Sequence, residues 1–277
     1  MHALGDAEYA LGRGRAEYDR LIEQAEILRP LTERMLRSAG IGAGMHVLDI
    51  GCGVGDVSFL VSNLVGAEGS VTGVDLDGDA VVVAEQRRAA QGLTNVSFCQ
   101  ADARSLDSGG VFDAAVGRFV LMYLHDPTEA LRLFAERVRP GGILAFCEMT
   151  SVTATSAAQQ PVLAELLALF TSAFERSGAR PDIGAEMYSR MGDAGLLPDP
   201  RPLAEVVLCP ARDAVAYRRW ALFARSMLPK IVEYGLGGED EIRRRVEHDL
   251  REELLAGTGL VPLSWLTIGQ WARLSAQ

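Results

Sequence analysis

Residues 47–56 constrain the fold of this chain more than any other stretch. They read VLDIGCGVGD, a short apolar run followed by Gly51, Gly53 and Gly55. An apolar segment compatible with a helix follows over residues 57–65. This order predicts a strand, a tight turn and a helix, which is how an α/β sheet presents a nucleotide-like ligand at the carboxyl end of a strand. Glycine suits such a turn because it adopts positive φ and lets the backbone approach the ligand closely.

Strand and helix signals alternate from residue 46 to about residue 150. Short β-type apolar runs are separated by segments of helical periodicity, and glycine or proline marks the turns. This alternation predicts right-handed crossovers and a parallel sheet with helices on both faces. The expected strands are 47–50, 70–74, 96–99, 112–116 and 143–147, the expected helices are 57–64, 80–91 and 128–138, and 139–142 is expected to be a turn.

The flanks of this region are mainly helical. Before it, residues 5–40 show apolar positions at helical spacing, and Pro30 is expected to break or restart that helix. After residue 150 the regular alternation ends and longer helical segments take over. The helices expected there are 158–176, 184–194, 213–232 and 239–256, and the strands are 203–208 and 262–270.

Length and composition limit the class of protein and its partners. With 277 residues, 48% apolar and 23% charged, the chain can form one large domain or two. The formal charge of −10 disfavours nucleic acid and anionic membranes, which bind basic faces. The four cysteines lack metal-ligand spacing, the first residues lack a signal-peptide pattern, and no apolar run approaches the ~20 residues of a membrane span. We expect a cytoplasmic, metal-independent protein without nucleic-acid or membrane partners.

Carboxylates around the glycine turn argue against a pyrophosphate ligand. Asp49 precedes the turn, and Asp56 stands where the dinucleotide fingerprint GxGxxG has its last glycine. Carboxylates at these positions repel phosphate and attract a cation. Asp75 ends the second strand and suits a ribose diol, the alternative being a solvent-facing turn residue. Asp102 follows the third strand and suits an adenine amine, the alternative being the N-cap of a helix at 103–108.

The chain resembles the class I S-adenosylmethionine-dependent methyltransferases, in particular their small-molecule branch. The motifs that carry the resemblance are VLDIGCGVGD, VTGVDLD, QADA, FDAAVGRFVLMYLHDP and RPGGILAF, which cover about a third of the chain. The resemblance implies an α/β, Rossmann-like sheet of seven mostly parallel strands in the order 3-2-1-4-5-7-6, with strand 7 antiparallel. It also implies an N-terminal helical cap at 1–44, a methyltransferase domain at 45–277, and helical lid insertions at about 155–180 and 211–258.

The same resemblance implies roles for individual residues toward S-adenosylmethionine. Asp49 and the glycine turn would lie near the methionine part of the cofactor, Asp75 at the ribose and Asp102 at the adenine. Gln24 and Tyr18 in the cap would reach toward the cofactor. The cofactor-binding residues that we expect are Asp49, Gly51, Gly53, Gly55, Asp75, Leu76, Asp102, Ala103, Arg118, Phe119 and Gln24.

Methyl transfer is an in-line displacement at an activated methyl group, so the protein mainly positions the reactants and excludes water. An oxygen acceptor such as a phenol benefits from a general base. His125 and Glu148 stand after the fourth strand and at the end of the fifth, so both are catalytic candidates. The alternatives are that His125 simply precedes a helix and that Glu148 accepts a hydrogen bond from the substrate.

The leading hypothesis is methylation of a small, hydrophobic or amphipathic metabolite, with oxygen favoured over nitrogen or carbon. The nucleic-acid methyltransferase signature is absent after the fourth strand, where the chain has Gly117, Arg118, Phe119 and Val120. A non-methylating enzyme, such as a cyclase that uses the bound cofactor as a scaffold, is the alternative. An NAD-dependent dehydrogenase is disfavoured by Asp49 and Asp56. A homodimer is a further possibility.

Overall fold

The computed structural model describes residues 7, 11, 14–106, 111–151 and 160–275. Most of the first 13 residues of the expected cap, residues 107–108 of the helix proposed after Asp102, and residues 155–159 of the first lid insertion lie outside the described residues.

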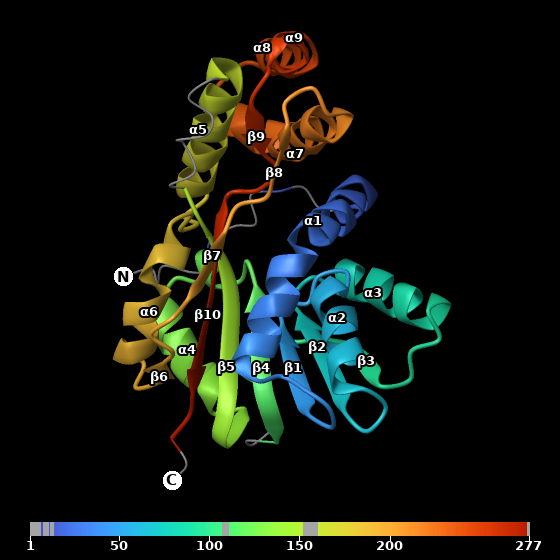
Figure 1. The fold of residues 1–277 in the computed structure, drawn as a ribbon, viewed down its shortest axis with the longest axis vertical. Coiled ribbons are helices and arrows are strands. Elements are labelled where there is room, and N and C mark those ends of the chain that lie inside the picture. The colour runs from blue at the N-terminus through green and yellow to red at the C-terminus, as the bar shows by residue number, and fades with distance from the viewer. Residues whose placement is uncertain (1–6, 8–10, 12–13, 107–110, 152–159, 276–277) are drawn as a thin grey trace.

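One sheet forms the centre of the molecule, in the order β3-β2-β1-β4-β5-β10-β6, with β7 also paired to β10 (Figure 1). β1 to β5 are parallel and β10 is antiparallel to β5. This confirms the predicted fold class and strand order, since β6 and β7 together occupy the position of the expected sixth strand. The strands are β1 (His46–Ile50), β2 (Ser70–Asp75), β3 (Val96–Gln100), β4 (Phe112–Arg118), β5 (Val138–Thr150), β6 (Leu197–Pro198), β7 (Leu203–Glu205) and β10 (Leu266–Arg273).

Helices cover both faces of the sheet. On one face α2 and the second half of α1 pack on strand residues such as Val47, Val71 and Ala145, and α3 lies beside them (Figure 1). On the other face α4 and α6 pack on strand residues such as Leu48 and Leu144. The helices are α1 (Arg15–Ala39), α2 (Asp56–Val65), α3 (Gly78–Ala90), α4 (Pro127–Ala135) and α6 (Ile183–Asp193), and η1 (Leu121–Tyr123) is a single 3-10 turn.

A layer of helices stands beyond the carboxyl ends of β1 to β5, at the top of Figure 1. Its centre is a group of packed aromatic rings, with Phe223 4.8 Å from Trp265 and 5.1 Å from Phe170 between ring centroids. No helix among the described residues is long and apolar enough to cross a membrane. The layer consists of α5 (Pro161–Arg176), α7 (Ala214–Glu233), α8 (Glu239–Arg244), the π-helical turn η3 (Arg245–Leu250), α9 (Arg251–Ala256) and the small sheet of β8 (Leu208–Pro210) and β9 (Leu260–Pro262).

The expectation that Pro30 breaks the N-terminal helix is wrong, because α1 continues through it. A proline inside a helix removes one backbone donor and crowds the preceding turn. The apolar side chains on both sides, Leu28 and Leu31, are buried against the rest of the protein. Their burial keeps both halves of the helix in place across the weak point.

Other differences concern strands. The segment 139–142, expected to be a turn, belongs to β5, where the pairing register with β4 shifts between Phe112 and Ala114. Gly141, at φ +75°, allows this irregularity, and the end of the chain pairs with the segment, since the Leu274 N–H donates to the Gly142 carbonyl. The strand expected at 203–208 is divided between β7 and β8, which pair with different partners.

Candidate functional site

A pocket of about 320 Å³ lies at the carboxyl ends of β1, β2 and β4, between the first half of α1 and the helical layer. Most of the cofactor residues expected from the sequence line it, whereas Asp49, Gly55, His125 and Glu148 do not. The expected residues in the lining are Gln24, Gly51, Gly53, Asp75, Leu76, Asp102, Ala103, Arg118 and Phe119.

The three glycines of the turn after β1 have different tasks. All have positive φ, +64° at Gly51, +52° at Gly53 and +93° at Gly55. A Cβ at Gly51 would stand 2.6 Å from Val120 Cγ2, and one at Gly55 would stand 2.8 Å from Phe59 Cζ, so both allow close packing. A Cβ at Gly53 would meet nothing within 4 Å. Gly53 therefore presents bare backbone to the pocket.

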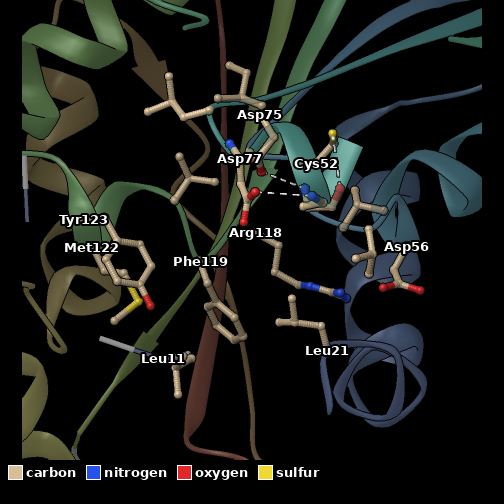
Figure 2. Close-up of a pocket in the computed structure, with 18 of the residues that line it drawn as sticks. Leu11, Leu21, Cys52, Asp56, Asp75, Asp77, Arg118, Phe119, Met122 and Tyr123 are labelled. Carbon is tan, nitrogen blue, oxygen red and sulfur yellow. Dashed lines mark hydrogen bonds between the residues drawn. The ribbon is translucent and has the colours of Figure 1, made fainter. Parts of the chain in front are cut away.

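Asp75 joins the glycine turn to the end of β2 (Figure 2). Its Oδ2 accepts a hydrogen bond from the Gly53 N–H at 2.8 Å, and its Oδ1 accepts one from the Asp77 N–H at 2.8 Å. Burial raises the pKa of this carboxyl group, and the two backbone donors oppose the rise. Each carboxylate oxygen has two lone pairs, so one on each oxygen remains for a ligand with two hydroxyl groups.

Asp102 lies further along the pocket and is held by Arg104. Arg104 Nη2 is 2.7 Å from Asp102 Oδ2, and the Arg104 backbone N–H donates to Asp102 Oδ1 at 2.9 Å. The Arg104 side chain keeps the pKa of Asp102 below its usual value, so the carboxylate stays ionised as an acceptor. Residues 103–106 form no helix, so the described part of the alternative N-cap helix is not present.

Asp49 lies beneath the glycine turn rather than in the pocket wall. It is 1% exposed, and its Oδ2 accepts a hydrogen bond from Ser58 Oγ at 2.5 Å. Its Oδ1 has no hydrogen-bond partner among the described residues. Burial raises the pKa of Asp49 to about 7, while Ser58 and Arg118 act in the opposite direction. A cation bound at the turn would favour the charged form of this carboxyl group.

Glu148 holds the loop that follows β4. It is fully buried, and its Oε1 accepts the backbone N–H groups of Val120 and Leu121, both at 2.8 Å. Burial raises its pKa to about 8. These bonds fix the loop beside Phe119, which at φ +58° is the one non-glycine residue with positive φ among those described. Glu148 thus supports the pocket from behind instead of facing it, because its backbone donors lie on the other side.

His125 is exposed and does not line the pocket. It comes directly before α4, whose N-terminus is capped by Asp126, with Oδ1 accepting the Glu129 N–H at 3.0 Å. The position therefore fits the alternative reading of a residue that precedes a helix. Neither catalytic candidate is brought to the pocket.

The part of the pocket away from Asp75 contains residues that the sequence analysis did not identify. Glu17, Arg20 and Arg219 are buried there. One signal was present in the sequence, since Glu17, Arg20 and Gln24 follow the helical spacing of a face that continues into buried Leu28. Around them is a mostly apolar wall, and Figure 2 shows its members Leu11, Leu21, Phe119, Met122 and Tyr123.

The residues present fit S-adenosylmethionine. Gly53 offers open space against bare backbone, Asp75 retains acceptor capacity for a ribose diol, and Asp102 is an ionised acceptor further along. The unpartnered oxygen of Asp49 supplies negative potential beneath the turn, where a cationic amino-acid part would lie. Among the described residues, no three His, Cys, Asp or Glu side chains are grouped as metal ligands.

Comparisons with known proteins agree with this fit. A family model described as a methyltransferase domain matches residues 41–185. Aklanonic acid methyltransferase DauC of Streptomyces sp. (strain C5) is 31% identical over 138 residues, which cover 50% of this chain and 62% of that protein. Demethylmenaquinone methyltransferase of Staphylococcus aureus (strain MRSA252) is 31% identical over 160 residues, covering 56% and 62%. The chain therefore spans less than two thirds of these relatives.

Solved structures share the fold at low sequence identity. The YcgJ protein from Bacillus subtilis superposes with a TM-score of 0.60 at 20% identity, covering 88% of this chain and 97% of that one. The [4+2]-cyclase SpnF superposes with a TM-score of 0.53 at 19% identity, covering 99% and 88%. The matched family model spans the glycine turn, Asp75, Asp102 and the loop after β4. The chain belongs to the methyltransferase domain family, within the class I proteins whose cofactor is S-adenosylmethionine.

Proposed function

We propose that this protein transfers a methyl group from S-adenosylmethionine to a small hydrophobic or amphipathic metabolite. The observation that carries the proposal is a single pocket lined both by the glycine turn with Asp75 and Asp102 and by side chains of α1, α5 and α7. A pocket of this kind holds two molecules in contact while protein surrounds both. Such positioning is the main requirement of a displacement reaction.

The cofactor half binds and orients. Asp75 would accept hydrogen bonds from the two ribose hydroxyls, Asp102 would accept one from the adenine amine, and the turn around Gly53 would lie against the methionine part. When bound, the cofactor supplies a methyl group already activated by a sulfonium, so the chain need not activate it. Phe119, held in its strained conformation by the loop, would form the wall between the two halves of the pocket.

The acceptor half is largely apolar and would exclude water from the reaction. Rings from three elements contribute to its wall, including Tyr123, Phe174 and Phe223. The names of the two relatives, methyltransferases of an acid and of demethylmenaquinone, support an acceptor with apolar character. The buried charges here are Arg20, Arg219 and Glu17, and this balance disfavours a cationic amine. We therefore favour oxygen as the methylated atom.

The two catalytic candidates take different places in this proposal. Glu148 acts as a positioning residue, since its Oε1 is already engaged by two backbone N–H groups of the loop. His125 has no role at the reacting atoms, because it is exposed outside the pocket. An acceptor whose oxygen is already ionised needs no general base.

Calorimetry with S-adenosylmethionine and S-adenosylhomocysteine tests the cofactor part of the proposal. Both should bind well below the millimolar range, and failure of both to bind would refute it. Transfer is tested by incubation with cofactor carrying a deuterated methyl group and a panel of apolar acids, phenols and quinones. Mass spectrometry should find the label on an acceptor. An acceptor that is rearranged without gaining the label would identify the cyclase-type alternative instead.

A further inference from the structure

Four polar side chains are buried together where α1 meets α7, at the acceptor end of the pocket. They are Glu17, Arg20 and Gln24 of α1 and Arg219 of α7, all of which line the pocket and are no more than 8% exposed. Groups of this kind are expensive to bury unless each donor and acceptor is satisfied. The hydrogen bonds of the cluster show which capacity remains.

The acceptor atoms of the cluster are already used. Both carboxylate oxygens of Glu17 accept from Arg20, each at 2.7 Å, and one also accepts from Ser226 Oγ at 2.5 Å. The carbonyl oxygen of Gln24 accepts from Arg20 Nη1 at 2.7 Å and from Arg219 Nη2 at 3.0 Å. The nearby Glu23 is bound by the exposed Arg218. Glu17 is therefore committed to Arg20, and Glu23 to Arg218.

Arg219 keeps one donor group without a partner. Its Nε donates to the Leu263 carbonyl at 3.1 Å and its Nη2 donates to Gln24, but Nη1 is buried and has no hydrogen-bond partner among the described residues. Arg219 is 3% exposed and its charge faces that of Arg20, with one buried glutamate between two arginines. Burial and the charge of Arg20 lower the pKa of Arg219 to about 9. The cluster thus lacks one negative charge.

The surroundings of the unpartnered donor are aromatic. The guanidinium carbons of Arg20 and Arg219 each lie 5.3 Å from the centre of the Phe223 ring. The Trp265 ring lies 4.8 Å from the same ring and also lines the pocket. A flat apolar ligand that carries one anionic group matches this combination of ring surfaces and a single spare charged donor.

We propose that the methyl acceptor is a ring-containing carboxylic acid, bound as its carboxylate with an oxygen accepting a hydrogen bond from Arg219 Nη1. This inference rests on the proposed methyltransferase function and adds the chemical class of its substrate. The carboxylate supplies the missing charge of the cluster and satisfies its last buried donor. An amine, or a neutral ring without an acidic group, leaves that donor unmet.

Binding of a matched pair of probes tests the inference. The probes are 2-naphthoate and 2-naphthamide, which share the ring and differ in charge, measured by calorimetry on the protein with and without saturating S-adenosylhomocysteine. We expect naphthoate to bind about tenfold to a hundredfold more tightly, which corresponds to one charged hydrogen bond. Arg219→Met, which keeps the length of the side chain but removes the donors, should abolish the preference. Arg219→Lys should retain part of it.

Arg218→Gln is the matched control, because Arg218 is the adjacent arginine, is 69% exposed and pairs with Glu23 outside the cluster. This variant should keep the full preference. Each variant is also checked for an unchanged melting profile and unchanged binding of S-adenosylhomocysteine, which separates a lost anchor from a lost fold.

The outcomes separate this inference from the proposed function. Failure of S-adenosylhomocysteine and S-adenosylmethionine to bind the unaltered protein counts against the methyltransferase. Normal cofactor binding, together with naphthoate binding no better than naphthamide or with no binding of either, overturns the carboxylate. A preference that survives in folded Arg219→Met overturns the assignment to Arg219.

Discussion

Gly53 offers the sharpest test of where the cofactor lies. The change is Gly53→Ala, which places a methyl group where the structure has open space within 4 Å, at a residue that lines the pocket. At φ +52° an alanine is strained by about 1–2 kcal/mol, so the melting temperature should fall by a few degrees. If the methionine part of the cofactor lies against this backbone, the added methyl group also displaces it. Loss of one charged hydrogen bond would then weaken binding about tenfold to a hundredfold.

Gly92→Ala separates these two effects. Gly92 has a similar φ of +66° and equally open surroundings, but it follows α3 and does not line the pocket. Both variants should lose similar stability by differential scanning calorimetry, and only Gly53→Ala should lose affinity for S-adenosylhomocysteine by titration calorimetry. Equal affinities in the two variants would show that the cofactor does not approach the turn and would refute the reasoning.

Three further predictions concern carboxyl groups. Asp75→Ala should weaken binding of S-adenosylmethionine by about 1–3 kcal/mol in calorimetry, because charged hydrogen bonds to the ribose are lost, and unchanged affinity would remove Asp75 from the site. Glu148, with its pKa raised to about 8, holds a proton that the unfolded chain releases near the ordinary value, so its contribution to stability is present at low pH and is lost as pH rises toward 8. In denaturant titrations Glu148→Gln should therefore remove up to about 1.4 kcal/mol per pH unit of that decline, and an unchanged slope would contradict the assignment. Asp49, with its pKa raised to about 7, must lose its proton to stabilise a cation, so affinity for S-adenosylmethionine should rise with pH through 7; Asp49→Asn should flatten the rise, and a persistent rise would assign it to another group.

The cofactor half of the site could be predicted from the sequence because its features are local. Gly53 lies in a turn directly after a strand, and Asp75 and Asp102 each follow another strand of the same sheet. Since the carboxyl ends of parallel strands meet at one edge, identifying the strands was enough to bring these residues together. The same reasoning yielded the sheet order, through the resemblance carried by these motifs.

The acceptor half could not be predicted in this way. Arg219 reaches Gln24 across 195 positions of sequence, through the packing of α7 against α1. In the sequence Arg219 looks like an ordinary surface arginine of a helix, as its neighbour Arg218 is. Only the tertiary fold decides which of the two adjacent arginines is buried.

Glu148 shows a second limit of reading strand ends. Its position at the end of β5 was correctly recognised as close to the site, but strand position does not tell whether a carboxylate faces a ligand or a backbone. The neighbouring loop carries two N–H groups with no strand partner, at Val120 and Leu121, and Glu148 satisfies both. A buried N–H must find an acceptor, so that demand outweighs availability to a substrate.

The glycine turn and Glu148 are connected through the same loop. Gly51 lies so close to Val120 that a Cβ would come within 2.6 Å of its side chain, and the Val120 N–H is bound by Glu148. The turn after β1, the loop after β4 and the end of β5 therefore fix one another. The strained Phe119 lies inside this arrangement, with its N–H donating to the Cys147 carbonyl at 2.9 Å. Since strain of this kind persists only where its surroundings over-determine it, we infer that these three strand ends hold Phe119 rigidly at the boundary between cofactor and acceptor.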